Sequence, residues 1–377
     1  MKLLVCASEY YPHGSGIANV VYNVVKVLKQ NGVDCTVCSP NGPDIQLGSH
    51  SLIQKMGIIG LLYFWYQVSR FFKKNNYDAV WLHNPFFTIS NPFHHSLVTI
   101  HTTYYGESLF QVGSSAYLRI YKKLVALIER NCLLRMKSST IFSGVGQPVC
   151  SELSEIGIDK DRIIYIPNGV DIKKFHPSEN KNIIRKKFGI PEEDVILLSV
   201  GRLTPQKQPH MMLEVFSVLE KQLDKIMLCI AGKGELLDST QRLAKKMGIQ
   251  KIKFLGHVDN QELPDLYACS DYFIMTSKYE GTPLTLLEAM STGLPCIVSD
   301  IPNLEMVQDA DCGIVVRFSE IQKAADEILN YLKSGHSDHA KNARMYTLTN
   351  LDWEIISEQY LKVFSDISKL YKNQIQH

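Results

Sequence analysis

Residues 279–300 read YEGTPLTLLEAMSTGLPCIVSD, and this stretch decides the fold class because it predicts a loop, a helix and a strand in succession. Thr282 can cap a helix N-terminus, and Pro283 suits the first helical position, where no backbone N–H is required. A mostly apolar segment follows, and Gly293 in the sequence GLP is a stop signal. Residues 296–300 have the composition of a short buried strand. An apolar helix that leads into a buried strand is the repeating unit of an α/β fold.

Two glutamates bracket the start of the predicted helix. Glu280 lies in the loop before it, and Glu288 lies about five residues into it, a rise of roughly 7–8 Å. The helix N-terminus between them offers free N–H groups and the positive end of the helix dipole, which suit an anion. A ligand with hydroxyl groups at both ends and phosphate in the middle fits this layout, and a nucleotide-sugar is such a ligand.

Strands alternate with helices on both sides of this unit. The pattern predicts parallel sheets covered by helices on both faces, and it restarts at residue 195, so that each half can form a doubly wound domain. Turn formers and charges place the hinge near residues 175–181. We expect domains at residues 1–176 and 177–350, a final segment at 351–377, and a ligand between the domains. The predicted strands are residues 3–7, 35–39, 79–83, 97–101, 195–200, 227–231, 253–255, 272–275 and 296–299, and the first helix is residues 17–30.

Composition narrows the class of protein. The chain has 377 residues, of which 45% are hydrophobic and 21% charged, so it is long enough for two globular domains. A net charge of +2 gives no basis for nucleic-acid binding. Nine scattered cysteines and no recognisable secretory signal lead us to expect a cytoplasmic protein with free thiols. Because no Asp-x-Asp or His-Glu cluster suggests a divalent-cation site, we expect no built-in metal site.

A second loop has the outline of a phosphate site. Gly201 follows the predicted strand at 195–200, and Arg202 and Lys207 lie in the same loop before a helix. Glycine permits close backbone approach, Arg202 offers a fork of N–H donors, and Lys207 offers a point charge. A pair of solvated loop cations is the alternative. The helix after Pro283 is expected at the same sheet edge, and this favours the phosphate site.

The first half of the chain contributes two weaker candidates for ligand-binding residues. Gly14 and Gly16 form a glycine loop after the first strand, without the third glycine of the dinucleotide-binding fingerprint. This loop is consistent with backbone amides near a phosphate or sugar. His101 ends a predicted strand and can face a ligand, although a hydrogen-bonded structural histidine is the alternative. For His83, which also ends a strand, we favour the structural interpretation.

Two apolar segments could lie at a membrane surface. Residues 57–66 are almost continuously apolar and are followed by the basic run RFFKK, but the segment is shorter than a membrane span. It predicts either a core helix or an interfacial helix that guards a lipid acceptor. Residues 117–137 mix apolar and aromatic residues with basic ones, and solvated helix charges explain them equally well. We therefore expect the segment at 52–72 to be the first candidate for a peripheral membrane surface.

Over nearly its whole length the chain resembles the family 4 retaining glycosyltransferases, which have the GT-B architecture of two Rossmann-like domains. No single motif is specific, but their order and spacing together are. The motifs are residues 12–16, FHHSLVTIHTT around His101, IPNGVD at 166–171 with Phe175, GRL at 201–203 with Lys207, AGKG at 231–234, FLGHV at 254–258, EGTPLTLLEA at 280–289 and GLP at 293–295.

The resemblance implies a role for each matching position. Arg202 and Lys207 would bind the donor diphosphate, Glu288 the ribose hydroxyls, and Glu280 hydroxyls of the donor sugar. His101 would lie near that sugar, and the final helix would pack back on the first domain. The remaining donor-binding positions would contribute backbone groups along the sugar and phosphates: Gly14, Gly16, Gly281, Thr282, Pro283 and Leu284. One departure from the family is Pro302-Asn303-Leu304-Glu305, where two small residues, often Gly-Gly, are usual.

The implied activity is transfer of a hexose or hexosamine to a hydroxyl group of a glycan or lipid-linked acceptor. A UDP-sugar is the favoured donor and a GDP-sugar the second choice, with no further cofactor. Arg202, Lys207 and the helix N-terminus would stabilise the leaving phosphate without a metal. No carboxylate is obviously placed as a covalent nucleophile, so front-face attack with retention is favoured on the family's account. A nucleotide-sugar epimerase or a phosphorylase on the same scaffold is the alternative, and a non-catalytic sugar-nucleotide sensor is a third possibility.

Overall fold

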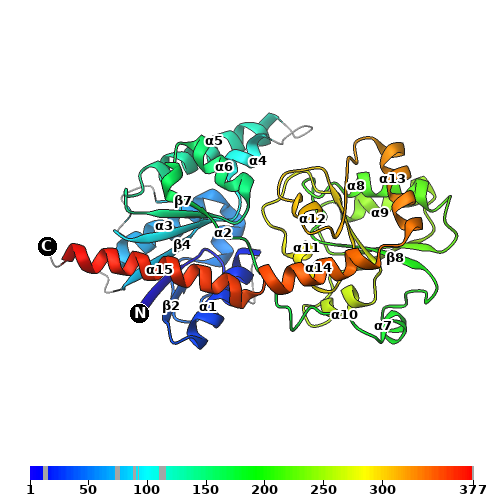
Figure 1. Ribbon diagram of the computed structural model, residues 1–377. Coiled ribbons are helices and arrows are strands. Elements are labelled where there is room, and N and C mark those ends of the chain that lie inside the picture. Colours follow the sequence, from blue (N-terminus) through cyan, green and yellow to red (C-terminus); the bar gives the residue numbers. More distant parts are fainter. Residues whose placement is uncertain (12–15, 73–76, 88–90, 92, 110–115, 376–377) are drawn as a thin grey trace. The chain divides into compact units, whose positions relative to one another are not determined.

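The computed structural model describes residues 1–11, 16–72, 77–87, 91, 93–109 and 116–375, which form two compact units (Figure 1). The first unit consists of Met1–Asn168 and Trp353–His377, and the second of Gly169–Asp352. This division falls before the 176/177 boundary expected from the sequence. Val170 and Phe175, which precede the expected 176/177 boundary, are buried in the core of the second unit and therefore belong to it.

The first unit is built on a seven-stranded parallel sheet in the order β3-β2-β1-β4-β5-β6-β7. Its central strands are buried on both faces, as expected of a parallel sheet between two helical layers. The strands are β1 Lys2–Cys6, β2 Asp34–Ser39, β3 Ile45–Gln46, β4 Ala79–His83, β5 Ser96–Ile100, β6 Ile141–Gly144 and β7 Ile163–Tyr165.

Alternate residues of these strands face different helical layers. One face contributes Leu4, Val80 and Val98 to a core shared with α3, α5 and α6. On the other face Trp81 packs against Tyr360 of α15, which also lies along α1. The helices are α1 Gly16–Gln30, α2 His50–Met56, α3 Ile58–Phe71, α4 Tyr104–Leu109, α5 Ala116–Leu134, α6 Gln147–Ile156, a short 3₁₀ turn at Lys160–Arg162, and α15 Trp353–Ile375.

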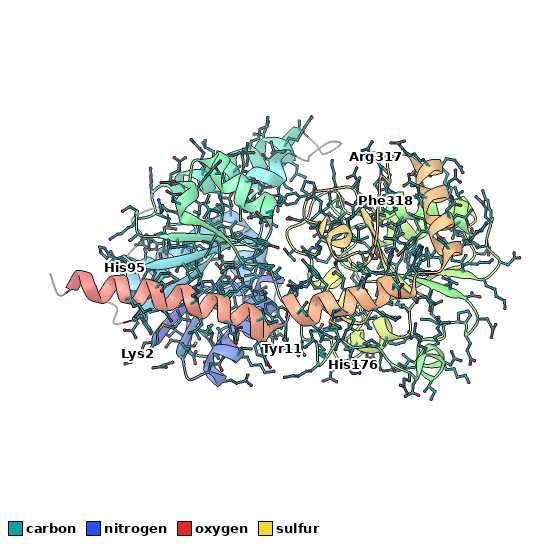
Figure 2. The ribbon with its side chains drawn as sticks, viewed as in Figure 1. Lys2, Tyr11, His95, His176, Arg317 and Phe318 are labelled. Carbon is teal, nitrogen blue, oxygen red and sulfur yellow. The ribbon has the colours of Figure 1, made fainter. Side chains whose placement is uncertain are left out.

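The second unit has a six-stranded parallel sheet in the order β10-β9-β8-β11-β12-β13. Leu198 and its neighbours pack against α10, α11 and α14, while Leu197 and its neighbours pack against α8, α9 and α13. Figure 2 shows side chains throughout both layers and labels Arg317, which follows the last strand. Arg317 pairs with Asp300 at 3.0 Å. The strands are β8 Val195–Val200, β9 Ile226–Ala231, β10 Ile252–Gly256, β11 Tyr272–Met275, β12 Cys296–Ser299 and β13 Gly313–Val316. The helices are α7 Lys181–Phe188, α8 Pro209–Leu219, α9 Leu237–Met247, α10 Leu263–Ala268, α11 Leu284–Ser291, α12 Met306–Asp309, α13 Ile321–Ser334 and α14 Ser337–Asn350.

The predicted fold class, two parallel-sheet α/β domains, is confirmed. Every strand predicted from the sequence is present within one or two residues of its expected ends. The apolar segment at 52–72 forms α2 and α3, and α3 buries Phe64, Trp65 and Val68 in the core of the first unit. The apolar side chains of this segment are therefore largely explained by the packing of a core helix. Across the described residues, no helix has both the length and the apolar character needed to cross a bilayer.

Candidate functional site

The loop between β8 and α8 lines a pocket at the carboxyl end of the second sheet. Gly201, Arg202 and Lys207 line it together with Thr276 and Ser277, which follow β11. Strands β8 and β11 are neighbours in the parallel sheet, so their carboxyl ends lie at the same edge. The structure therefore brings the two predicted phosphate-binding residues together in one concave surface.

Glycine residues allow the β8–α8 loop to lie directly against the loop that follows β9. Gly201 has a φ of 154° and Gly232 a φ of 148°. A Cβ added to Gly232 would collide with the carbonyl oxygen of Gly201, and one added to Gly234 would collide with that of Leu203. The N–H of Leu203 donates to the carbonyl of Lys233 at 3.0 Å. The AGKG motif thus supports the β8–α8 loop by backbone contact.

Lys207 and Glu280 form the central ion pair of the site. The Lys207 Nζ lies 2.5 Å from the Glu280 Oε1, and the Glu280 side chain is only 7% exposed. Lys207 is a quarter exposed, so its ammonium group reaches from solvent to a buried carboxylate. Arg202 is exposed, and no hydrogen bond or ion pair of its side chain is found among the described residues. Of these two cations, Lys207 is therefore ion-paired, and Arg202 is available to a ligand.

The loop that carries Glu280 is fixed from two sides by side-chain amides. Gln206 Nε2 donates to the carbonyl of Tyr279 at 2.7 Å, and Asn303 Nδ2 donates to the carbonyl of Glu280 at 2.8 Å. Asn303 has a φ of 74°, in the left-handed region that asparagine tolerates better than most residues. The asparagine that replaces the family's usual small residue thus keeps a glycine-like conformation and adds a contact to the Glu280 peptide.

The start of α11 differs by one residue from the prediction. The helix begins at Leu284 with Pro283 as its N-cap, whereas Thr282 was expected as the cap and Pro283 as the first helical residue. The reason is the backbone of Pro283, whose ψ of 119° is extended and not helical. The N-cap residue Pro283 makes no side-chain capping hydrogen bond, and the first turn of α11 carries the positive end of the helix dipole. The segment from Gly281 to Pro283 is buried.

Glu288 is the fifth residue of α11, close to the predicted position, and is half-buried. The hydroxyl group of Tyr267 donates to its Oε2 at 2.9 Å. Burial raises the pKa of Glu288 to about 7, although the Tyr267 hydrogen bond and the charge of Lys174 act in the opposite direction. The carboxyl group consequently changes its charge near neutral pH. Tyr267, which sequence reasoning did not identify, orients it.

In the first unit, His101 directly follows β5 and forms a buried pair with His83. The His83 Nδ1 and His101 Nε2 atoms are 2.9 Å apart, and Asn84 Oδ1 accepts a hydrogen bond from the His101 N–H. Burial lowers the pKa of His101 to about 3 and that of His83 well below its usual value, so both rings are neutral at physiological pH. Gly16 is exposed at the start of α1, whereas Gly14 lies outside the described residues.

The side chains of this site and its surroundings carry no recognisable metal centre. Within the described part of the chain, no group of three or more His, Cys, Asp or Glu side chains is arranged to hold a metal ion. Arg202 and Lys207 supply positive charge at the pocket, and α11 begins four residues after Glu280, the ion-pair partner of Lys207. Such a set suits a diphosphate, which fixed cations and backbone amides bind well.

Two family models match most of the chain. The model of glycosyl transferases group 1 matches residues 180–347, and that of Glycosyltransferase Family 4 matches residues 14–174. Among curated relatives, an Escherichia coli UDP-Gal:alpha-D-GlcNAc-diphosphoundecaprenol alpha-1,3-galactosyltransferase is 27% identical over 361 residues, which is 90% of each chain.

Solved structures share the fold across nearly the full length. The glycosyltransferase WaaG of lipopolysaccharide biosynthesis has a TM-score of 0.77 at 20% identity, covering 96% of this chain and 99% of its own. Anabaena Alr3699/HepE in complex with UDP and glucose has a TM-score of 0.74 at 16% identity, covering 97% and 100%. The two parallel-sheet units, the site of the second unit and both family matches lead to one assignment: this chain belongs to the family 4 glycosyltransferases and has the GT-B fold.

Proposed function

We propose that the protein transfers a hexose or hexosamine from a UDP-sugar to a hydroxyl group of a glycan or lipid-linked acceptor, with retention of the anomeric configuration and without a metal ion. The observation that carries this proposal is the Lys207–Glu280 ion pair, with Arg202 in the same loop as Lys207 and the N-terminus of α11 four residues after Glu280. A cation that can bind phosphate and a carboxylate that can accept hydrogen bonds from hydroxyl groups are in contact there, which supports a ligand in which a sugar joins a diphosphate.

The site meets the electrostatic demand of the reaction. When the bond from the anomeric carbon to the diphosphate breaks, its electron pair passes to the phosphate oxygen, where negative charge grows. Arg202, Lys207 and the N–H groups at the start of α11 supply fixed positive charge there. The acceptor hydroxyl attacks the anomeric carbon from the side of the leaving group, and its proton passes to a phosphate oxygen. No residue is required as a covalent nucleophile.

Glu280 and Glu288 hold the two ends of the donor in this proposal. Glu280 releases Lys207 to the diphosphate and accepts hydrogen bonds from the donor-sugar hydroxyls, while Gly281 to Leu284 provide backbone groups alongside. Glu288, oriented by Tyr267, accepts hydrogen bonds from the ribose hydroxyls. For Lys207 and Glu280, the contacts to the donor replace the ion pair of the free protein. His101, Gly14 and Gly16 are proposed to contact the donor from the first unit on the strength of the sequence resemblance.

The choice of donor and acceptor class is supported by the similar proteins. The name of the E. coli relative specifies a UDP-galactose donor and a diphosphoundecaprenol-linked acceptor, and HepE was crystallised with UDP and glucose. WaaG is a glycosyltransferase involved in lipopolysaccharide biosynthesis. We therefore favour a UDP-sugar as donor, with a GDP-sugar as the second choice, and an acceptor that is a glycan carried on a lipid.

The test is a transfer assay with UDP- and GDP-sugars and lipid-linked or soluble glycan acceptors, in buffer containing EDTA. We expect release of free UDP together with an acceptor heavier by one sugar, and NMR of the product shows the donor's anomeric configuration. Lys207→Ala or Arg202→Ala lowers kcat by about 10²- to 10³-fold, the usual cost of losing one preorganised charge donor. Lys221→Ala, an exposed lysine after α8, is the matched control and leaves the rate unchanged.

Several results would contradict the proposal. An altered sugar still attached to UDP would indicate epimerisation. Inverted configuration in the product would rule out front-face transfer, and loss of activity in EDTA that Mg²⁺ restores would rule out a metal-free reaction. Full activity of both Arg202→Ala and Lys207→Ala in a verified preparation would remove the catalytic assignment of this loop.

A further inference from the structure

The helix α5 exposes a continuous apolar stripe to solvent. Tyr117 is 79% exposed, Ile120 69%, Leu124 55% and Leu127 53%, and their spacing of three and four residues places them along one face of the helix. The opposite face of the helix packs into the core through Val125 and other buried residues. Large apolar side chains that stay exposed as a contiguous row mark an interaction surface.

The charges on α5 show which kind of partner this stripe fits. Arg119, Lys123 and Arg130 are exposed beside it. The one acidic residue of the helix, Glu129, is only 2% exposed, and its Oε2 accepts the N–H of Tyr104 at 2.8 Å. The exposed face therefore combines apolar side chains with cations and presents no carboxylate. This combination matches an anionic lipid surface, where apolar groups enter the acyl boundary and basic groups reach the headgroups.

The neighbouring elements extend this surface. The Tyr121 hydroxyl lies 3.3 Å from the position of a Cβ on Gly57, so the start of α3 lies beside α5. Met56 and Ile59, on either side of Gly57, are 46% and 57% exposed. The apolar area thus continues from α5 to the junction of α2 and α3. Figure 1 shows α5 on the outside of the first unit, on the other side of its sheet from α15.

We propose that the protein binds an anionic lipid bilayer through the exposed face of α5, with the helix lying in the plane of the membrane surface. A second copy of the chain is a poorer occupant, because a symmetric contact between two α5 helices would bring like charges together. The proposal deepens the proposed function, since a protein held at the bilayer reaches a lipid-linked acceptor. Vesicle binding itself is measured without turnover, so the two proposals can fail separately.

The test compares co-sedimentation of the full chain with vesicles of phosphatidylglycerol and phosphatidylcholine. We expect binding to phosphatidylglycerol vesicles that weakens with salt, and weak binding to pure phosphatidylcholine. The double variant Ile120→Glu, Leu124→Glu changes exposed positions and lowers the affinity by about tenfold or more. Arg119→Gln and Lys123→Gln each lower it by about fivefold, the effect of one cation near an anionic surface.

The matched control is Ile183→Glu on α7 of the second unit, where Ile183 is 70% exposed. We expect the Ile183→Glu variant to bind vesicles with the same affinity as the unchanged protein. Thermal melting verifies that all variants fold, and transfer to a water-soluble acceptor stays normal in the α5 variants if the proposed function is correct. Absence of vesicle binding would overturn the proposal. So would binding that the α5 variants leave intact, equal binding to neutral vesicles, or a dimer in light scattering that only the α5 variants dissociate.

Discussion

At the scale of single residues, the proposed role of Glu288 predicts that its titration links donor binding to pH. The carboxyl group is half-buried against Tyr267, and its pKa is raised to about 7 by burial. Its folded pKa lies above the ordinary value, so this group stabilises the fold at low pH, and its contribution declines as the pH rises from about 4.5 through 7. Only the ionised form accepts hydrogen bonds with both oxygens, so binding of ribose hydroxyls follows the opposite trend.

We therefore predict that the affinity for UDP-glucose rises about tenfold between pH 6 and pH 8, the change expected for one ionising group with this pKa. Isothermal titration calorimetry measures it, and the diester phosphates of this donor do not titrate in that range. Glu288→Gln keeps the shape of the side chain, binds more weakly at pH 8 and removes the pH dependence. A pH dependence that persists in Glu288→Gln would assign the titration to another group.

Asn303 offers a second test at this scale, because its side chain and its backbone can be separated by substitution. Asn303→Gly tolerates the left-handed φ of 74° and removes only the hydrogen bond to the Glu280 carbonyl. Asn303→Ala removes the same bond and also strains the backbone.

If the amide positions Glu280 for the donor sugar, both variants lower kcat/KM for the donor by about five- to tenfold, in line with about 1 kcal/mol for one hydrogen bond. Only Asn303→Ala then loses additional stability in urea denaturation. Discrimination between UDP-sugars that differ in a hydroxyl group relaxes in both variants. A normal kcat/KM and unchanged sugar preference in Asn303→Gly would show that the residue serves the loop conformation alone.

At the scale of elements, the contact between the β8–α8 loop and the AGKG loop is the most demanding feature of the site. Gly232→Ala would force a methyl group against the Gly201 carbonyl, a backbone atom that cannot rotate away. We expect a loss of about 3 kcal/mol or more in the free energy of unfolding, since backbone displacement adds to the strain of a positive φ. Equilibrium urea denaturation measures it.

Gly248 provides the matched control for this prediction. It also has a positive φ, 74°, but an added Cβ would meet open space. Gly248→Ala should therefore cost only about 1 kcal/mol, the ordinary penalty for a left-handed residue. Equal losses in the two variants would show that the loop contact is not a constraint on the structure.

The elements also show how far sequence reasoning reaches. Long buried strands such as β8 and β9 were predicted because uninterrupted apolar runs have few other uses. The short strands β6 and β13 were missed, since IFSG and GIVV are too brief to stand out from apolar loops. The helix after Pro283 was predicted one residue early, because proline at the first helical position and proline at the cap have the same sequence pattern.

Some contacts within the candidate site could not be predicted from the sequence either. Motif spacing identified Arg202, Lys207, Glu280 and Glu288, but the ion pair between Lys207 and Glu280 joins residues 73 positions apart and depends on the sheet order. Tyr267 reaches Glu288 from a different helix, and no local pattern marks it. The stripe on α5 was visible as a mixed helix, yet only the structure shows which of its faces is exposed.

At the scale of the whole molecule, the chain ends by returning to the unit in which it began. Helix α15 belongs to the first unit, where Tyr360 is fully buried against Trp81. The Trp81 Nε1 donates to Thr99 Oγ1 at 2.8 Å, which in turn contacts Ser143, so the aromatic contact covers a small polar network. The first unit therefore depends on a helix that follows the whole second unit in the sequence.

We predict that Tyr360→Ala destabilises the first unit by about 3–5 kcal/mol, the usual cost of removing a buried aromatic side chain. Differential scanning calorimetry should show one transition shifted to lower temperature while the transition of the second unit is unchanged. Leu370→Ala, at a 58% exposed position of the same helix, is the control and shifts neither. A uniform shift of all transitions in Tyr360→Ala would mean that the two units unfold together.

The central claim is that a sugar diphosphate binds between Arg202, Lys207 and the N-terminus of α11, with Glu280 on the sugar. A crystal structure of the protein with a bound UDP-sugar tests it most directly. We predict diphosphate oxygens within hydrogen-bonding distance of Arg202 and Lys207, and sugar hydroxyls at a Glu280 side chain that no longer contacts Lys207. A diphosphate bound elsewhere, with the Lys207–Glu280 pair intact, would contradict the account.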